Sequence, residues 1–437
     1  MRTWSRIGIY LACALLIVFA LGVGGCGDDG VPSSSETTAA PPTSATTGGG
    51  STDTTGAGST DTTGAAGEVK ELVVGTVMPM SGALSVVGLS WNRGYDLYAE
   101  KVNEEGGVKI GDDTYTIKVL KEDGKGQADS AGAAARKLIQ DGATVLFGEV
   151  MDGATAAVYD VAKQNGVLHV IASANTPGNP ADIGADKDLL VRLSNSFDDA
   201  HTADLDFLKE KYPDVKTIAV SQPDVGFEGQ IEDFTAAAKE RGFEVIGAEK
   251  WAFGISDFVP TYTKLLSFQP DAIFIMVSAQ SPYQLQAARQ LGFTGPILAN
   301  SPMGPEVHVR VAGPEACTDF FCNGINPSEP TELMADIMQR YEEAFKDEWI
   351  SDCLLAWDEL WILVQAMQKA GSTDPAAVLA TLDSMTNVGD VKTSFGDARM
   401  GGMERFGVNR ALVRPVPISL IMDGEIMLQG YFESANR

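Results

Sequence analysis

Few residue types that can do chemistry occur in this chain of 437 residues, which has only three histidines. His201, in "SFDDAHTADLD", stands beside Asp198, Asp199 and Asp204, and such a group of nitrogen and carboxylate donors suits a metal ion. The same stretch also fits the start of a helix, which Ser196 or Asp198 would cap and acidic residues would favour. We favour the helix start and expect neither a metal nor a cofactor.

The other two histidines give no sign of catalysis. His169 lies within the apolar strand pattern "VLHVIA" and is expected in the core, and His308 in "EVHVRVAG" is expected at the surface. The chain also has no GxSxG elbow, P-loop, HExxH or strand-linked GxGxxG motif. These observations favour a binding protein over an enzyme.

The N-terminus has the pattern of an export signal. Arg2 and Arg6 precede an apolar run, Ile7–Leu21, and "VGGC" ends at Cys26. Small residues directly before a cysteine resemble the lipobox of bacterial lipoproteins. We therefore predict a signal peptide over residues 1–25, lipidation of Cys26, and a location outside the cytoplasm on the membrane.

Residues 26–67 are predicted to be a disordered tether. From Val31 the segment is made of Ser, Thr, Gly, Ala and Pro, and it repeats an octad as "STDTTGAG" and "STDTTGAA". A flexible coil of about 40 residues has an end-to-end distance of roughly 35 Å.

The formal net charge of −27 argues against a nucleic-acid partner, because no basic stripe is available to neutralise phosphates. After removal of the signal and the tether, about 370 residues remain, enough for two domains of ordinary size. Three cysteines lie in this part. In an oxidising compartment we expect a disulfide, with Cys317–Cys322 as the first choice and Cys353 left over.

Strand and helix patterns alternate from Glu71 onward. "LVVGTVM", "ATVLFG" and "DAIFIMV" are unbroken apolar runs of strand length, and helical spacing separates them, as at Trp91–Gly107. Asp358 and Glu359 interrupt the apolar run "CLLAWDELWILVQAM", which is predicted to be an amphipathic helix with a broad core face. The class is α/β, with two doubly wound lobes in which ligands bind outside the carboxyl ends of the strands. The loops at these ends are Ser81–Ser90, Glu149–Gly153, Ser173–Asn179, Gln222–Gly229, Ser278–Pro282 and Ser301–Pro305.

The stretch "FGEVMDGATAAV" raises the question of charge at one such end. It predicts a strand, a turn and a helix, and a helix N-terminus attracts anions, yet Glu149 and Asp152 already place carboxylates there. Asp152 either caps the helix Gly153–Asn165 or faces the ligand. Both roles stay open from the sequence.

Several motifs, in order, resemble the type I periplasmic binding proteins of the leucine/isoleucine/valine-binding family. They are "VGTVMPMSGALSVVGLSWNRGYDLYAEKVNEEGGV", "DGATVLFGEVMDGATAAV", "NGVLHVIASANTP", "SDFVPTYTKLLSFQPDAIF" and "ARQLGFTGPIL". The resemblance implies two lobes joined by a three-strand hinge, a small-molecule ligand in the cleft, closure on binding, and delivery to an ABC permease. It implies an N-terminal lobe of residues 68–194 plus 327–413 and a C-terminal lobe of 195–326 plus 414–437. We expect a monomer.

Carried over residue by residue, the family's amino-acid site is altered. The carboxylate-binding serine falls on Asp152, the next hydroxyl on Asn175 beside Ser173, and the ammonium-pairing acid on Ser301. The second-lobe aromatic falls near Phe227. We also expect Ser81 and Ser278 in the cleft, and Trp91 either stacked on the ligand or packed in the core.

These changes predict a ligand that is neutral or cationic at the Asp152 end, such as an amide, a polyol or an amine. The first function is therefore the solute-binding lipoprotein of an importer. A sensor module of the same fold that signals through a partner is the second. An extracellular enzyme that uses Asp198, Asp199 and His201 is the third.

Overall fold

The computed structural model describes most of the chain beyond the predicted tether. The described residues are 68–173, 182–195, 197–224, 229–252, 254–276, 278, 280–300, 304–323, 329–346 and 349–432. All of them fall within one compact unit, Thr63–Arg437. The predicted signal peptide, Cys26 and the tether lie outside the described residues.

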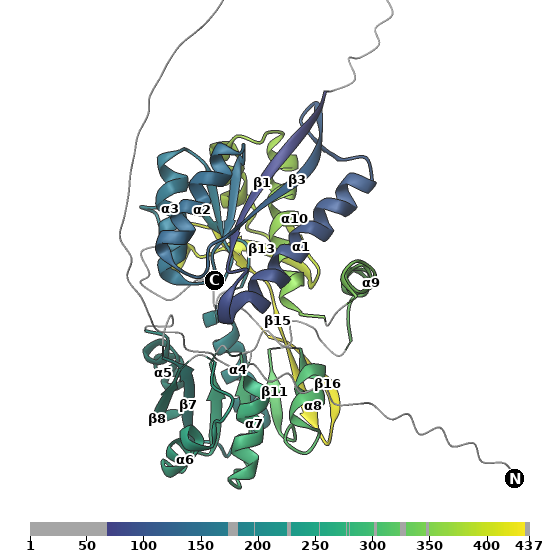
Figure 1. The fold of residues 1–437 in the computed structure, drawn as a ribbon. Coiled ribbons are helices and arrows are strands. Elements are labelled where there is room, and N and C mark those ends of the chain that lie inside the picture. The colour runs from purple at the N-terminus through teal and green to yellow at the C-terminus, as the bar shows by residue number, and fades with distance from the viewer. Residues whose placement is uncertain are drawn as a thin grey trace, which may run out of the picture. The chain divides into compact units, whose positions relative to one another are not determined.

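The first of two β-sheets has nine strands in the order β12-β13-β14-β6-β5-β4-β1-β3-β2 (Figure 1). Its central pairs, from β14 to β3, are parallel, and antiparallel strands close both edges. The strands are β1 (Val69–Met78), β2 (Val108–Ile110), β3 (Asp113–Asp123), β4 (Val145–Gly148), β5 (Leu168–Ile171), β6 (Leu190–Arg192), β12 (Val391–Thr393), β13 (Gly396–Gly401) and β14 (Ala411–Val413).

The second sheet has seven strands in the order β16-β15-β11-β10-β9-β7-β8. The strands from β8 to β11 are parallel, and β15 and β16 add an antiparallel hairpin at one edge. The strands are β7 (Thr217–Pro223), β8 (Glu244–Trp251), β9 (Ala272–Ile275), β10 (Ile297–Ala299), β11 (Phe320–Cys322), β15 (Val416–Met422) and β16 (Glu425–Phe432).

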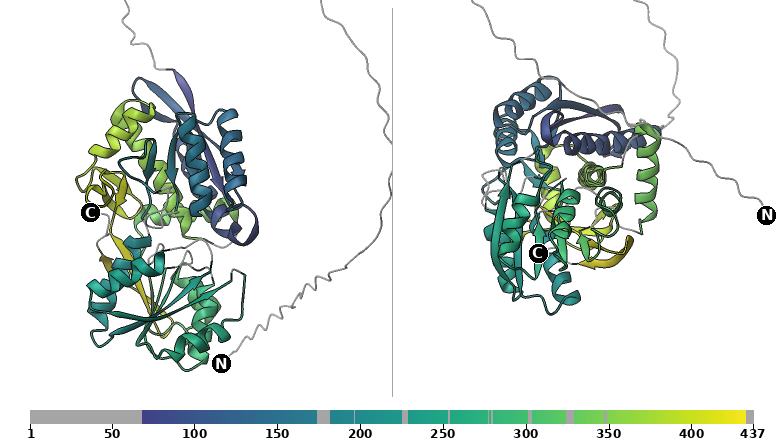
Figure 2. Two further views of the ribbon diagram at one scale, coloured as in Figure 1. Left: turned by 90° about the vertical axis from the view of Figure 1, so that its left-hand side faces the viewer. Right: turned by 60° about the horizontal axis from the view of Figure 1, so that its bottom comes forward.

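Helices cover both faces of each sheet (Figures 1 and 2). In the first sheet, α1, α10 and α11 pack on one face and α2 and α3 on the other; in the second, α4 and α5 oppose α6, α7 and α8. The helices are η1 (Gly82–Leu84), α1 (Ser85–Glu104), α2 (Ala128–Gln140), α3 (Asp152–Gln164), α4 (Phe197–Lys211), α5 (Gln230–Glu240), α6 (Val259–Ser267), α7 (Ser281–Gln290), α8 (Pro305–Ala312), α9 (Glu332–Phe345), α10 (Asp352–Ala370), α11 (Pro375–Ser384) and α12 (Met403–Phe406).

The chain crosses between the two sheets three times: after β6, after β11, and between β14 and β15. The predicted fold of two doubly wound lobes with a three-strand hinge is confirmed. We call the parts built on the nine-stranded and seven-stranded sheets the first and second lobe. The residue boundaries of the lobes stay a prediction.

Helix α10 is more deeply buried than its sequence suggests. Asp358 and Glu359 interrupt the apolar run of the sequence, but their side chains are buried, with exposures of 1% and 0%. Hydrogen bonds make this burial tolerable. Asp358 accepts from the N–H and hydroxyl of Ser394 at 2.7 and 2.9 Å, and Glu359 accepts from the Tyr95 hydroxyl at 2.6 Å.

The predicted Cys317–Cys322 disulfide is wrong for this structure. Cys317, Cys322 and Cys353 are all free and buried. Cys322 lies in β11 and Cys317 in the turn before it, and both thiols pack in the apolar core beneath α6 and α7. Burial raises the pKa of Cys317 to about 12, and the pKa of Cys322 is also raised by burial.

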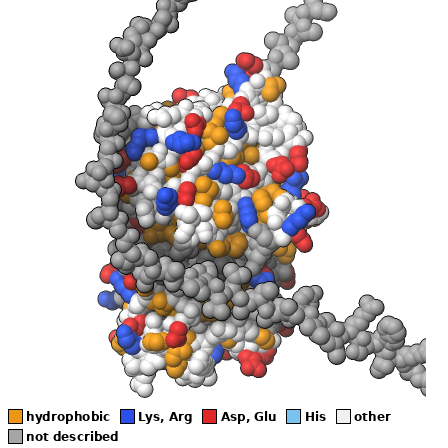
Figure 3. Space-filling model, viewed as in Figure 1, with side chains coloured by type: hydrophobic (Ala, Val, Ile, Leu, Met, Phe, Trp, Pro, Cys, Tyr) orange, Lys and Arg blue, Asp and Glu red, His pale blue; other side chains and the backbone are white. Residues whose placement is uncertain are grey.

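The search for membrane spans covered only the described part of the chain. None of the helices in that part combines the length and the apolar composition that a bilayer crossing requires. On the face drawn in Figure 3, basic and acidic side chains lie interspersed.

Candidate ligand-binding site

The carboxyl ends of β1, β3 and β4 meet at one edge of the first lobe, because these strands are parallel neighbours. Asp123 ends β3 and binds the chain that follows β1. Its carboxylate accepts from the Met80 N–H at 2.9 Å, the Ser81 hydroxyl at 2.6 Å and the Lys125 N–H at 3.0 Å. Burial opposes ionisation, but these hydrogen bonds outweigh it, so the pKa of Asp123 lies below its ordinary value. Ser81 is exposed at this edge.

The Glu149 carboxylate occupies the region before α3 where a helix N-terminus would attract an anion. Its side chain is fully buried. One carboxylate oxygen accepts from the Gly126 N–H at 3.0 Å, and the other accepts from the N–H groups of Val150 and Met151 at 3.0 and 3.2 Å. A Cβ at Gly124 would lie 2.6 Å from this carboxylate, so only glycine fits there. The protein's own carboxylate therefore occupies the backbone donors ahead of α3.

Burial raises the pKa of Glu149, the three N–H groups oppose the shift, and the charge of Asp123 adds to it. Glu149 and Asp123 therefore interact as like charges at one strand edge. A second anion brought to this edge would meet repulsion.

Asp152 does not cap α3, contrary to one of its two predicted roles. The helix begins at Asp152 itself, and the residue before it, Met151, makes no side-chain cap hydrogen bond. Asp152 is partly buried in the first turn, where its charge favours the helix dipole. Glu149, three residues earlier, accepts from the backbone N–H groups of Val150 and Met151 just ahead of the helix.

In the second lobe, Ser278 follows β9 and is 2% exposed. Its hydroxyl oxygen accepts from the Gln280 N–H at 3.0 Å and the Gln284 side-chain amide at 2.9 Å. Gln284 in turn accepts from the hydroxyls of Ser221 and Tyr262 at 2.6 and 3.1 Å. This network fixes Ser278 at the carboxyl end of its strand.

The prediction for His308 is wrong, because this residue is buried. Its ring bonds the Ser281 hydroxyl at 2.7 Å and the Gly304 carbonyl oxygen at 2.9 Å, and burial lowers its pKa to about 4. His169 is buried as predicted and bonds the Gly148 carbonyl oxygen, and burial lowers its pKa to about 4 as well. Both rings are neutral structural groups at neutral pH.

His201 is 2% exposed, and its ring packs edge-on against Phe234 and Phe274. Within the described ranges, no group of three or more His, Cys, Asp or Glu side chains could hold a metal ion. Trp91 lies in the core of the first lobe at 1% exposure. This position agrees with packing in the core, which is one of the two roles predicted for Trp91.

Ser173 is partly buried just after β5. The structure thus brings Ser81 and Asp152 to the strand edge of the first lobe and places Ser278 at that of the second. Three further candidates, Asn175, Phe227 and Ser301, lie outside the described residues.

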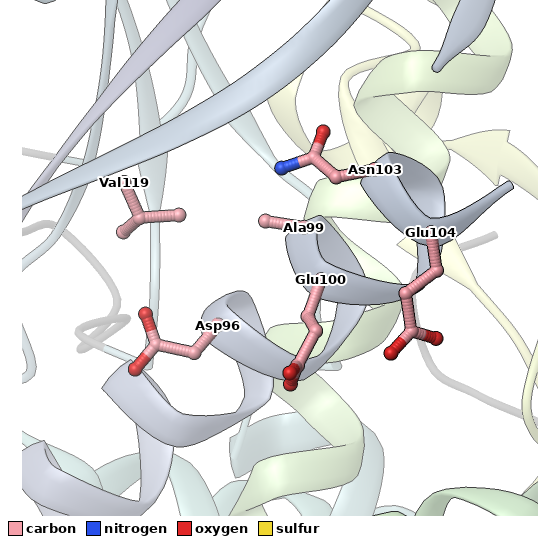
Figure 4. A pocket seen from close by; sticks show the side chains of 6 residues that line it. All are labelled: Asp96, Ala99, Glu100, Asn103, Glu104 and Val119. Carbon is pink, nitrogen blue, oxygen red and sulfur yellow. The ribbon is translucent and has the colours of Figure 1, made fainter. Parts of the chain in front are cut away.

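A hollow of about 590 Å³ lies elsewhere, between α1 and β3 (Figure 4). Asp96, Glu100 and Glu104 line it from successive turns. Lys121 pairs with Asp96, and Arg340 pairs with Glu104 at 3.1 Å. The hollow is therefore a solvated acidic face with counter-charges, away from the strand ends.

Comparison with known proteins adds to this geometry. The family model described as "Periplasmic binding protein" matches residues 71–417, which is most of the chain. The chain belongs to the periplasmic binding protein family. Within it, this periplasmic binding protein is of type I and of the leucine/isoleucine/valine-binding kind, as its motifs predicted.

Individual relatives of this periplasmic binding protein are distant. A Leu/Ile/Val-binding protein homologue of Brucella melitensis is 23% identical over 319 residues, covering 71% of this chain and 82% of the relative. A leucine-binding protein of Thermotoga maritima shares the fold with a TM-score of 0.66 and 20% identity, over 83% of this chain and 99% of that one. A solute-binding protein of Rhodopseudomonas palustris, in complex with 3,4-dihydroxybenzoic acid, shares the fold with a TM-score of 0.67 and 17% identity. The match covers 83% of this chain and 98% of that one.

The sequence reasoning missed the roles of Glu149 and Asp123 in this periplasmic binding protein. Glu149 was visible in the turn "GEVMDG", but its backbone partner at Gly126 is far from it in the chain. An acidic residue at the end of each of the two parallel strands that flank β1 was the available signal, because such ends meet at one edge.

Proposed function

We propose that the protein is the solute-binding lipoprotein of an ABC importer, anchored outside the cytoplasm through Cys26. Family membership supports the binding role and the permease partner. The N-terminal pattern of the sequence supports export and lipidation. The ligand would bind between the strand edges of the two lobes, and closure would be a population shift towards the state that contacts it from both sides.

The ligand is proposed to be neutral or cationic where it meets the first lobe. The observation that carries this proposal is Glu149, whose carboxylate already accepts from the N–H groups of Gly126, Val150 and Met151. Asp123 and Asp152 add two more carboxyl groups to the same edge. A ligand carboxylate, which leucine and dihydroxybenzoic acid both carry, would therefore compete with fixed negative charge.

A calorimetric and thermal-shift screen tests this proposal. Amides, polyols and amines are expected to include a solute that stabilises the native state by about 2.7 kcal/mol at 100 times its Kd. Free α-amino acids are expected to give no tight binding. Asp152→Ala should weaken binding of an amine, because it removes a charge at the strand edge.

Asp129→Ala is the matched control, since Asp129 is an exposed acidic residue in the first turn of the neighbouring helix α2. Tight binding of leucine that Asp152→Ala leaves undiminished would contradict the proposed ligand class.

Substitution of Cys26 tests the proposed lipid anchor separately from ligand binding. Cys26→Ser should move the exported protein from the membrane fraction to the soluble fraction and remove the mass of the attached acyl chains. Each buried CH₂ contributes about 0.8 kcal/mol to membrane binding, so loss of several chains is decisive. Cys353→Ser should leave the protein on the membrane. Intact Cys26 in the mature protein, with no lipid by mass spectrometry, would refute the anchor.

A further inference from the structure

Four buried polar side chains of the second lobe carry atoms that have no hydrogen-bond partner within the described part of the chain. We call them the polar layer: Asp204, Gln230, Asn300 and Asn323, which are 0%, 1%, 9% and 6% exposed. The unbonded atoms are both carboxyl oxygens of Asp204, both amide atoms of Gln230, the Asn300 nitrogen and the Asn323 oxygen. More than about nine in ten buried polar groups are bonded in proteins, so four in one lobe call for a physical reason.

Two members of the polar layer are neighbours in the sheet. Ala299 of β10 pairs with Cys322 of β11, so Asn300 and Asn323 directly follow paired positions at the carboxyl edge. Asn300 lies two residues beyond Leu298, and Asn323 two beyond Phe321. Leu298 and Phe321 belong to the core beneath α4 and α5. Because strand side chains alternate, both asparagines belong to that same face.

Asp204 lies above this edge on α4. Phe207, one turn later in the helix, packs its ring on Phe321 with centroids 4.7 Å apart. The helix runs from the crossing after β6 towards β7, so its earlier turns cover the carboxyl ends of the strands. One turn advances about 5.4 Å and two strand residues about 6.6 Å, which brings Asp204 to the level of Asn323.

Gln230 reaches the same level from α5. Phe234, one turn later, stacks on Phe274 of β9 at a centroid distance of 4.2 Å. Gln230 is therefore placed over the end of β9, and β9 pairs with β10 beside Asn300. The polar layer thus crosses the ends of three adjacent strands, beneath the middle of α4 and the first turn of α5.

The chemistry of the polar layer is mixed but uncharged. Its free atoms include amide donors and amide acceptors. Burial holds the pKa of Asp204 well above its ordinary value, which favours the neutral carboxyl group, and that form both donates and accepts. Hydroxyl and carboxamide groups have the same dual character, whereas an ammonium only donates and a carboxylate only accepts.

We propose that the polar layer is the second lobe's recognition surface for a neutral ligand with several hydroxyl or carboxamide groups. This inference rests on the proposed function and narrows its ligand class. The Ser278 network marks the contrast, because Gln284 is equally buried in the same lobe and is bonded by Ser221, Tyr262 and Ser278. Protein groups thus satisfy the buried Gln284 side chain, whereas the buried atoms of the polar layer named above lack such partners.

The test separates recognition from a structural role. Asn300→Leu and Asn323→Leu replace an amide that has one unbonded buried atom by an apolar group of similar size, so Tm without ligand should rise by about 2–4 °C. The probes are myo-inositol, ribitol, acetamide and urea, with L-leucine and putrescine as charged comparisons. The Kd of the neutral solute that binds the wild type should increase at least about tenfold, or about 1.4 kcal/mol, in each variant.

Gln284→Leu is the matched control, because it breaks satisfied hydrogen bonds and should lower Tm. Binding of myo-inositol or ribitol would identify a ligand with hydroxyl groups, and binding of acetamide or urea would identify a ligand with a carboxamide group. The inference is overturned if the leucine variants bind the neutral solute as the wild type does, or if only L-leucine or putrescine binds. Those results leave solute binding intact, whereas a wild type that binds no solute of any class counts against the proposed function itself.

Discussion

Arg414→Met is expected to destabilise the folded body by about 3–5 kcal/mol near pH 8, because it removes the positive charge that stabilises the buried Asp358 carboxylate. Arg414 lies at the third crossing between the lobes and is 4% exposed. Its guanidinium stands 3.7 Å from the centre of the Phe395 ring. Burial lowers its pKa to about 10, and the charge of Asp358 opposes that shift.

The loss of stability caused by Arg414→Met should increase with pH. Burial raises the pKa of Asp358 to about 7, while Ser394 and Arg414 hold it down. A carboxyl whose folded pKa is raised contributes full stability below its unfolded value of about 3.8, and that stability is lost as pH rises through the folded value. Near pH 5, Asp358 is protonated with or without Arg414. The deficit of Arg414→Met should therefore be small there and grow towards pH 8.

Urea unfolding at both pH values measures this difference. Asp358→Asn in the Arg414→Met background should restore much of the loss near pH 8, because it removes the unpaired charge. Arg340→Met is the surface control, since the ion pairs of Arg340 with Glu104 and Asp336 are solvated and should change stability by less than about 1 kcal/mol. An equal deficit at both pH values would show that lost packing, and not charge, explains the result.

Gly94→Ala is expected to lower the free energy of unfolding, although alanine favours a helix by about 1 kcal/mol. A Cβ at Gly94 in α1 would lie 2.3 Å from the Cys353 carbonyl oxygen and 2.7 Å from the Ala356 side chain. Both neighbours belong to α10, so the two helices would have to separate. Overpacking of this kind costs typically about 1–3 kcal/mol beyond any propensity gain.

Gly132→Ala in α2 is the matched substitution, and it is expected to raise the free energy of unfolding. Its Cβ would meet no atom closer than 3.6 Å, so the propensity gain of about 0.5–1 kcal/mol should appear as increased stability. Denaturant titrations of both variants give the comparison. If Gly94→Ala were as stabilising as Gly132→Ala, the close approach of α1 and α10 would not exist in solution.

The fold was predictable because its signals are local. The apolar run at Leu72–Met78 became β1, and the helical spacing from Trp91 fell within α1. Antiparallel strands at the sheet edges were not predicted, since short strands such as β12 carry little pattern of their own. The burial of Asp358 and Glu359 was also missed, because Ser394 and Tyr95 supply their hydrogen bonds from elsewhere in the chain.

The candidate site was predictable only in outline. Parallel strand ends must share an edge, so the sequence located Ser81, Asp152 and Ser278 correctly at strand ends. It did not show that Glu149 would turn back into the N–H groups of Gly126 and Met151. His308 was misplaced because its partners, Ser281 and Gly304, come together only when α7 and α8 pack.

The three buried thiols have a practical consequence for biosynthesis. Thiolate is the reactive form of cysteine, and burial keeps Cys317, Cys322 and Cys353 protonated and out of reach of oxidants. Maturation of the body from Glu68 onward therefore requires no oxidoreductase to form these bonds. The same body should fold in a reducing cytoplasm as readily as outside the cell, and dithiothreitol should leave its melting curve unchanged.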